Sequence, residues 1–213
     1  MFKDRKEAGR QLAEKLKDFR DSSETVIVAL PRGGVIVGKE VAQVLRLPLT
    51  ALPVKKLRAP ANSELAIGAI SINKVKYLNF ELIKALSVSD DFLSSEISEK
   101  EKQVGEQALI FRTDIDYLTS FRYYIIIDDG IATGSTVLAA VKLLRNGLKD
   151  KKKIIVAVPV IARDIFEVLQ NEVDRLETMV VSSDFKAVGQ FYRNFKQVSD
   201  KEVIHSLRKG EEN

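Results

Sequence analysis

Two hydrophobic patterns alternate along the chain from its first residues. Within 2–20, Leu12, Leu16 and Phe19 are spaced i, i+4 and i+7 among charged residues, which predicts an amphipathic helix. The run TVIVAL at 25–30 is apolar and β-branched without polar alternation, as in strands buried on both faces of a parallel sheet. Such a strand needs helices above and below it, so the pattern predicts a layered α/β fold.

The same alternation continues over the rest of the chain. After a break at PRGG (31–34), Val37, Val41 and Val44 lie on one face of a predicted helix. Further strands are predicted at 47–54, 124–127, 154–160 and 176–182, and further helices at 90–108, 135–146 and 162–171. This order predicts an open, mainly parallel, twisted α/β sheet flanked by helices, with right-handed crossovers.

Residues 55–71 (KKLRAPANSELAIGAIS) interrupt this order. Basic residues, Pro60 and Asn62 leave no helical period, so the segment is predicted to be a long loop, with an excursion of β-structure as the alternative. The chain has no internal repeats, and 213 residues fit one domain with a modest appendage. We therefore expect a single domain over 1–213.

Composition narrows the class of chemistry. The 34 Lys and Arg against 30 Asp and Glu give a net charge of +4 without a polybasic block, which argues against a nucleic-acid coat protein. The absence of Cys excludes disulfides, thiolate zinc sites and cysteine nucleophiles, and His205 is the one histidine. No stretch reaches the roughly 18 apolar residues of a membrane span, and the first residues lack the apolar core of a signal peptide. We expect a cytoplasmic globular protein with no nucleic-acid or membrane partner.

The segment YYIIIDDGIATGSTVLAAVKLL (123–144) carries the candidate chemistry. A buried strand ends in Asp128 and Asp129, and Thr133 to Thr136 then fall where the next helix begins. Free N–H groups at a helix start and nearby hydroxyls favour a phosphate, and Gly134 allows its close approach. The adjacent carboxylates would repel a phosphate but suit the hydroxyls of a vicinal diol or a cation. Acids on one side and a phosphate cradle on the other match a sugar 5-phosphate.

Competing explanations of this segment fit less well. TGST alone is also typical of an ordinary strand-to-helix turn with Thr or Ser capping, but such a turn does not need the two acids before it. The sequence has no GxxxxGK[ST] loop, no GxGxxG after a strand and no DxDGT motif. It also lacks a GxSxG elbow, so an α/β hydrolase or phosphatase is a weak alternative.

The sequence DDGIATGST after a hydrophobic strand resembles the signature of the type I phosphoribosyltransferases, which bind 5-phosphoribosyl 1-diphosphate (PRPP). DRKEAGRQLA, ALPRGG, NSELAIGAI and FYRNFKQVSDKEV are similar to segments of an uncharacterised bacterial subgroup of that family. The resemblance implies that Asp128 and Asp129 contact the ribose hydroxyls and hold Mg²⁺ indirectly or through water. It assigns the 5-phosphate to the loop residues Ala132, Thr133, Gly134, Ser135 and Thr136.

The resemblance also gives PRGG a role. In the family this loop binds the diphosphate and often contains a non-proline cis peptide bond. By that resemblance Arg32 supplies positive charge here, while Gly33 and Gly34 supply backbone N–H groups. The alternative is a helix-entry turn with an exposed arginine.

Segment 55–71 corresponds in position to the mobile catalytic loop of the family, which closes over PRPP and excludes water. Lys55, Lys56 and Arg58 are candidates for neutralising the departing diphosphate together with Mg²⁺. Glu64 is the single acid of the segment and a candidate base or metal contact. Ordinary surface charges, and a structural role for Glu64, are the alternatives.

The resemblance implies an enzyme of nucleotide metabolism that transfers the 5-phosphoribosyl group of PRPP to a nitrogen of a nucleobase or related heterocycle. Ala132 stands where enzymes for 6-oxopurines commonly carry an acid, so a hypoxanthine or guanine enzyme fits less well. A non-catalytic regulator that binds PRPP or a nucleotide on the same fold is the alternative, although the basic residues at 55–58 favour catalysis. Dimers are common in the family, so a homodimer is a further expectation.

Residues from about 160 to 213 are expected to contribute a hood over the nucleobase and a C-terminal tail. The aromatic residues of this part could stack on a base but are more often the core of a small subdomain; they are Phe185, Phe191, Tyr192 and Phe195. Ser199 and Glu202 have the spacing of a capping box, which predicts a last short helix.

Overall fold

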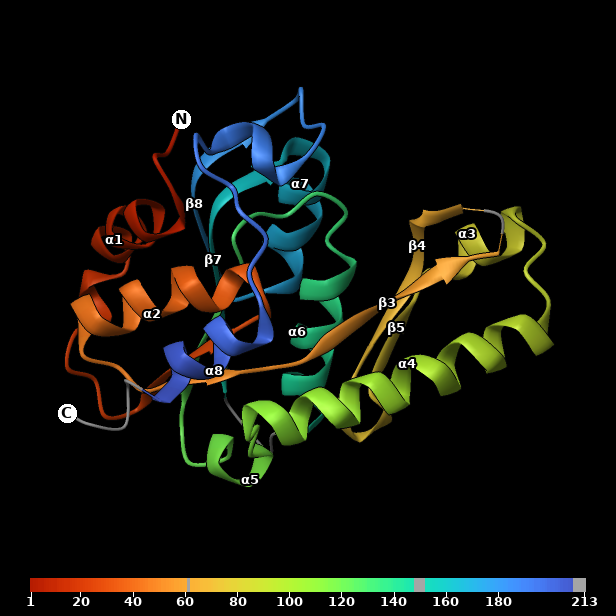
Figure 1. Ribbon diagram of the computed structural model, residues 1–213, viewed down its shortest axis with the longest axis horizontal. Coiled ribbons are helices and arrows are strands. Elements are labelled where there is room, and N and C mark those ends of the chain that lie inside the picture. The colour runs from red at the N-terminus through yellow and green to blue at the C-terminus, as the bar shows by residue number, and fades with distance from the viewer. Residues whose placement is uncertain (61, 148–151, 209–213) are drawn as a thin grey trace.

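A sheet of five parallel strands forms the main body of the computed structural model, which describes residues 1–60, 62–147 and 152–208 (Figure 1). The strands, in sheet order, are β2 (Leu49–Ala51), β1 (Thr25–Ala29), β6 (Tyr123–Ile127), β7 (Lys153–Ala162) and β8 (Arg175–Ser182). All four pairings are parallel. The open parallel sheet predicted from the apolar runs is therefore confirmed.

Helices cover both faces of this sheet, so its central strands are buried on both sides. Ile27 of β1 packs toward α1 (Arg5–Lys15) and α2 (Gly33–Leu45). Val26 and Val28 of the same strand pack in a second cluster with residues of α6 (Ser135–Gly147) and α7 (Arg163–Glu172). Alternate side chains of an extended strand point to opposite faces, so one apolar run supplies both layers of the core.

A second part of the chain, here called the arm, projects from the main body (Figure 1). It consists of the antiparallel strands β3 (Val54–Ala59), β4 (Asn62–Ser71) and β5 (Lys76–Leu78), with α3 (Phe80–Ala85) and the long α4 (Asp90–Phe111). Leu57, Ile67 and Ile70 of its sheet pack in one cluster with Val104 of α4. The arm therefore has a small core of its own.

The remaining elements are short helices and the last helix of the described chain. The short helices are η1 (Lys17–Phe19), η2 (Ile72–Lys74), α5 (Ile115–Leu118) and η3 (Val188–Phe191), and the last helix is α8 (Asp200–Arg208). Within the described part of the chain, no helix combines the length and apolar character needed to cross a membrane.

Two predictions about the middle of the chain were wrong. Residues 47–54 do not form one strand: β2 ends at Ala51 and β3 begins at Val54 in the other sheet, with Pro53, which has no N–H for a sheet ladder, between them. Residues 55–71 are not a long loop but most of the β3–β4 hairpin, the alternative considered from the sequence. Its pairing shifts register between Leu57 and Ala59, which hides the two-residue period.

The outer helices deviate less from expectation. Of the predicted helical segment 2–20, α1 covers Arg5–Lys15 and η1 covers Lys17–Phe19. The capping box is confirmed, since Ser199 N and Oγ both donate to Glu202 Oε2 and Glu202 N donates to Ser199 Oγ. The elements β5, α3 and α5 were not expected, because they are short and lack a clear apolar period.

Candidate active site

Two motifs meet at the carboxyl ends of neighbouring strands. β1 runs into PRGG and β6 runs into DDGIATGST, and the two strands pair in parallel with Ala29 opposite Ile127. Leu30 N extends the pairing by donating to Ile127 O at 2.8 Å. In open α/β sheets ligands bind beyond these strand ends. The tertiary structure thus brings together two segments that lie about a hundred residues apart.

The glycines of PRGG pack directly on the acid pair. A Cβ on Gly34 would lie 2.7 Å from Ile127 O and 2.8 Å from Asp128 Cα, and a Cβ on Gly33 would overlap Asp129 Oδ2. Only glycine permits this approach of the two backbones. The bond between Pro31 and Arg32 is a cis peptide, as the family resemblance implied.

The acid pair lies in a partly buried position. Burial and the negative charge of Asp129 raise the pKa of Asp128 well above its usual range, while Lys56 acts in the opposite direction. Burial also raises the pKa of Asp129, and Arg5 offsets part of that rise. Asp129 N donates to Asp128 Oδ1 at 2.8 Å, which ties the first carboxylate to the turn. A cation or a set of hydroxyl donors would stabilise the charged form of this pair.

Arg5 and Tyr192 contact the same aspartate, and the sequence analysis missed both. Arg5 Nε forms an ion pair with Asp129 Oδ2 at 2.6 Å, and Tyr192 Oη donates to Asp129 O at 2.6 Å. Arg5 lies 124 positions from its partner, so no local spacing could have predicted the contact. Its segment DRKEAGRQLA was noted for its resemblance, but without a role for the arginine.

The predicted phosphate loop lies at the start of α6, which begins at Ser135. Gly134 adopts a φ of +72°, a left-handed conformation that favours glycine, and Leu138 N donates to Gly134 O at 2.9 Å. Ile131 fixes the preceding turn by accepting from Ala162 N and donating to Val160 O. Thr133 is exposed, Ala132 and Thr136 are half-buried, and Ser135 is buried. Residues 132–136 therefore surround one helix start on a well-anchored turn.

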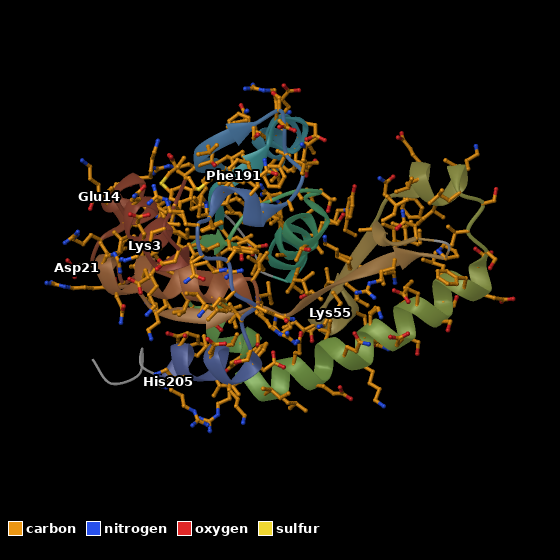
Figure 2. The ribbon with its side chains drawn as sticks, turned by 45° about the horizontal axis from the view of Figure 1, so that its top comes forward. Lys3, Glu14, Asp21, Lys55, Phe191 and His205 are labelled. Atoms are coloured by element: carbon orange, nitrogen blue, oxygen red, sulfur yellow. The ribbon has the colours of Figure 1, made fainter. Side chains whose placement is uncertain are left out.

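The basic residues of β3 divide into two groups. Lys55 lies where the arm leaves the main body (Figure 2), and burial and the nearby charge of Arg32 lower its pKa, against an opposing effect of Asp200. Lys56 is exposed but close enough to act on Asp128. Arg58 lies farther along the arm, where its N–H donates to Glu96 of α4. Lys55 and Lys56 thus lie near Arg32 and Asp128 respectively, whereas the backbone of Arg58 contacts α4, and the catalytic role of all three stays a prediction.

Glu64 belongs to β4, and its side chain lies outside the described residues. Its predicted role as a base or metal contact stays a prediction.

Arg32 connects the PRGG loop to the last helix. Its Nε pairs with Asp200 Oδ1 at 2.8 Å, and the two side chains are 41% and 38% exposed. A cavity of about 400 Å³ lies beside this pair, lined by Arg5, Arg32, Gly33 and residues 195–198. An anion that competes with Asp200 would therefore find an accessible arginine at the mouth of the site.

The aromatic residues after β8 pack among themselves. Ring centroids lie 5.0 Å apart for Phe185 and Phe191 and 5.2 Å apart for Tyr192 and Phe195. Tyr192 joins a buried cluster with Phe2, Ala8 and Val160. This arrangement favours a small packed subdomain over a set of rings free to stack on a base. Most of residues 163–182 belong to α7 and β8. The contact of Tyr192 with Asp129 shows that the segment after Ser182 reaches the strand ends.

Comparison with known proteins identifies the fold family. The model of the phosphoribosyl transferase domain family matches residues 2–196. Two proteins of Mycobacterium tuberculosis strains CDC 1551 and H37Rv, both named putative phosphoribosyl transferases, are 38% identical to this chain over 208 residues. The match covers 97% of this chain and 46% of each relative, so the chain spans about half of their length.

Two solved structures have a similar fold. The crystal structure of TT1426 from Thermus thermophilus is 32% identical and has a TM-score of 0.78, with 98% of both chains covered. The AQ2163 protein of Aquifex aeolicus is 14% identical with a TM-score of 0.50, over 84% of this chain and 74% of that one. The second comparison bears on the fold alone, whereas the first extends over nearly the whole chain.

Proposed function

Because the chain belongs to the phosphoribosyl transferase domain family, we propose that it is a Mg²⁺-dependent phosphoribosyltransferase that uses PRPP. It transfers the 5-phosphoribosyl group to a nitrogen of a nucleobase or related heterocycle and releases diphosphate. The observation that carries the proposal is the close contact of the PRGG backbone with the acid pair, a few residues before the start of α6. The groups that we assign to the three parts of PRPP belong to these two neighbouring segments, which supports the proposal.

In the proposed complex the ribose hydroxyls donate to Asp128 and Asp129. The 5-phosphate accepts hydrogen bonds from the backbone N–H groups of residues 132–136, where the positive end of the α6 dipole adds to its binding. The acids and this loop lie on one continuous turn that is anchored by Ile131 to β7. The spacing between hydroxyl acceptors and phosphate donors is therefore fixed before the ligand arrives, which lowers the entropy cost of binding.

The diphosphate lies against PRGG in this proposal. Breaking the bond between the anomeric carbon and the diphosphate oxygen leaves positive charge on the sugar and adds negative charge to the leaving group. Arg32, Lys55 and Lys56 are the cations that stabilise that growing charge. Because the charge of Arg32 acts on Lys55, an arriving anion relieves the repulsion between the two cations.

The donor set of the site fits Mg²⁺. The two carboxylates offer hard oxygen ligands, and burial of Asp128 makes a nearby cation favourable. Among the residues that the structure describes, no group of three or more His, Asp or Glu could hold a metal by itself. Mg²⁺ commonly keeps several waters and binds through one or two carboxylates together with substrate phosphates. When bound with PRPP, it supplies charge neutralisation for the departing diphosphate.

The β3–β4 hairpin is the proposed lid. Closure would move Lys55 and Lys56 toward the diphosphate and exclude water, which competes with the acceptor for the sugar. Hydrogen exchange across 55–71, with and without Mg²⁺ and PRPP, tests this role. Protection that appears only with the ligand is expected, and equal protection in both states would mean a static hairpin.

The proposed acceptor is a nucleobase or a related heterocycle. The segment after Ser182, as part of the predicted hood, is the candidate for contacting a nucleobase, and Ala132 argues against a 6-oxopurine. We further propose a cytoplasmic protein of nucleotide metabolism that forms a homodimer. The acceptor class, the cytoplasmic location and the homodimer are properties that the family resemblance implies.

The decisive experiment is a diphosphate-release screen with PRPP, Mg²⁺ and a panel of purine, pyrimidine and related heterocyclic bases. Release that depends on one acceptor, and that disappears in Asp128→Asn/Asp129→Asn, is the expected result. PRPP binding without release for any acceptor would instead favour the non-catalytic regulator. Absence of PRPP binding would remove the proposed function altogether.

A further inference from the structure

We infer that Arg5 and Tyr192 are positioning residues that hold Asp129 in the orientation in which its carboxylate receives a ribose hydroxyl of PRPP. This inference rests on the proposed function and extends the site to two residues outside the signature segment. Arg5 fixes the side chain of Asp129 and Tyr192 fixes its main chain.

The side-chain contact is short and mostly shielded from water. The Arg5 and Asp129 side chains are 11% and 13% exposed, and their ion pair joins Nε to Oδ2. A charge-assisted hydrogen bond in such surroundings is stronger and more directional than one at the surface. Because the pair uses Oδ2, Arg5 itself leaves Oδ1 of the carboxylate to accept from a ligand hydroxyl.

Arg5 is itself held on several sides. Its guanidinium carbon lies 3.8 Å from the centroid of the Phe195 ring, and Nη1 donates to Lys196 O at 2.8 Å. On another side it lies against the backbone of Gly33, where an added Cβ would come within 2.9 Å of Nε. An arginine fixed in this way restricts the orientation of the Asp129 carboxylate that it binds.

The main-chain contact comes from a buried tyrosine. Tyr192 Oη donates to Asp129 O, and its ring packs between Phe2, at a centroid distance of 5.5 Å, and Phe195. The next residue, Gly130, is also confined, since a Cβ there would lie 2.6 Å from Val160 Cγ2. The peptide that follows Asp129 is therefore held from both sides.

The two positioning residues belong to segments that are joined to each other. Phe2 N donates to Phe191 O, and Arg193 N donates to Phe2 O, each at 2.8 Å. Asn194 N donates to Lys3 O at 3.0 Å. Because residues 2–5 and 191–196 form one hydrogen-bonded unit, Arg5 and Tyr192 approach Asp129 as a single clamp.

The opposite role for Arg5 would be a latch that occupies Asp129 and leaves when the ligand binds. The two ion pairs of the site argue for positioning. Arg32 and Asp200 are about two-fifths exposed and can separate into solvent, whereas Arg5 is shielded and has a ring, a carbonyl and a glycine against it. Releasing Arg5 would leave a buried charge unpaired, which costs far more than opening a surface pair.

The experiment compares Arg5→Gln, Arg5→Lys and Tyr192→Phe with Arg10→Gln as the matched control. Arg10 belongs to the same helix and also forms an ion pair, with Glu40, but is 56% exposed. Calorimetry measures the affinity for Mg²⁺ with PRPP and, separately, for inorganic phosphate, and thermal unfolding measures stability. Inorganic phosphate is the second probe because it needs the loop at 132–136 but not the acids.

We expect Arg5→Gln to weaken PRPP binding about tenfold or more while phosphate affinity stays within twofold, since a hydrogen bond to a charged group is lost at the acids alone. Arg5→Lys restores most of the PRPP affinity, because an ammonium group can still pair with Asp129. Tyr192→Phe weakens PRPP binding severalfold, and Arg10→Gln leaves it unchanged.

Three results with the Arg5 variants would overturn the inference, and a fourth result, with the native chain, would overturn the proposed function instead. PRPP binding as tight as in the native chain in Arg5→Gln would mean that Arg5 has no part in the site, and tighter binding would identify a latch. Equal loss of PRPP and phosphate affinity, with no recovery in Arg5→Lys, would mean that Arg5 only stabilises the fold. A native chain that fails to bind PRPP would contradict the proposed function itself, which separates the two failures.

Discussion

The main body and the arm contribute to the candidate site in different ways. The main body presents its two motifs through backbone contacts between strands that are buried on both faces, as in the packing of Gly34 on the end of β6. The arm contributes the long side chains of Lys55 and Lys56 from an antiparallel hairpin with a small core of its own. The first arrangement fixes distances between backbones, whereas the second contributes charge through long, flexible side chains.

This difference suggests a division of work. Under the proposed function, the main body would bind the parts of PRPP whose charge does not change, the ribose hydroxyls and the 5-phosphate. The arm would act on the diphosphate, whose negative charge grows as the reaction proceeds. Changes in the main body should therefore affect binding and folding, and changes in the arm should affect turnover.

The largest expected effect is loss of PRPP binding in Asp128→Asn/Asp129→Asn. Two hydrogen bonds to charged groups disappear, so calorimetry should give an affinity for Mg²⁺ with PRPP lower by about a hundredfold or more. The matched control is Asp90→Asn/Asp91→Asn, two exposed adjacent acids at the start of α4 in the arm. Unchanged affinity in Asp128→Asn/Asp129→Asn would mean that the acid pair of the main body does not bind PRPP.

A smaller but still large effect is expected on folding when alanine replaces glycine in the two regions. Gly34→Ala should lower the free energy of unfolding by about 2 to 3 kcal/mol, because its Cβ would meet backbone atoms of β6 that cannot move aside. Gly105→Ala in α4 should raise it by about 0.5 to 1 kcal/mol, because nothing lies within 4 Å of that Cβ and alanine is the better helix former.

Chemical denaturation measures both glycine variants. Equal changes in the two would contradict the claim that the main body is the rigid region.

Lys56→Ala tests the arm. Turnover should fall about tenfold, and more than the affinity for PRPP falls, because a cation acting on the leaving group is worth most in the transition state. Steady-state kinetics with the acceptor found in the screen, beside a binding titration, separates the two effects. Lys102→Ala on α4, an exposed lysine of the same arm, serves as the control. If affinity and turnover fall together, Lys56 is an ordinary binding group.

The smallest expected effect is a pH dependence that originates at Lys55. Burial and Arg32 lower the pKa of Lys55, so its cationic form is lost at a lower pH than that of an exposed lysine. The diphosphate binds the cationic form, so PRPP affinity should decrease severalfold as pH rises through this pKa, and binding should take up a proton. Calorimetry in buffers of different ionisation enthalpy measures that uptake. Lys55→Arg should remove the pH dependence, and its persistence there would assign it to another group.

The sequence determined much of the main body. Runs such as TVIVAL and YYIIID are buried on both faces only in a parallel sheet, so the fold class followed from local patterns. DDGIATGST and PRGG were also recognised correctly as segments at strand ends, because a strand, a turn and a helix start are local in sequence. The arm was predicted poorly, since its strands are short, bulged and rich in basic residues.

Only the tertiary structure decided which residues share the site. Parallel pairing of β1 with β6 set PRGG against the acid pair, and the return of residues 191–196 over the strand ends brought Arg5 and Tyr192 to Asp129. Local patterns carry no information about such contacts, because they depend on how distant segments pack. The sequence alone therefore determined the chemistry of each motif, while the packing of distant segments decided the partners of each charged group, and with them its pKa and its exposure to ligand.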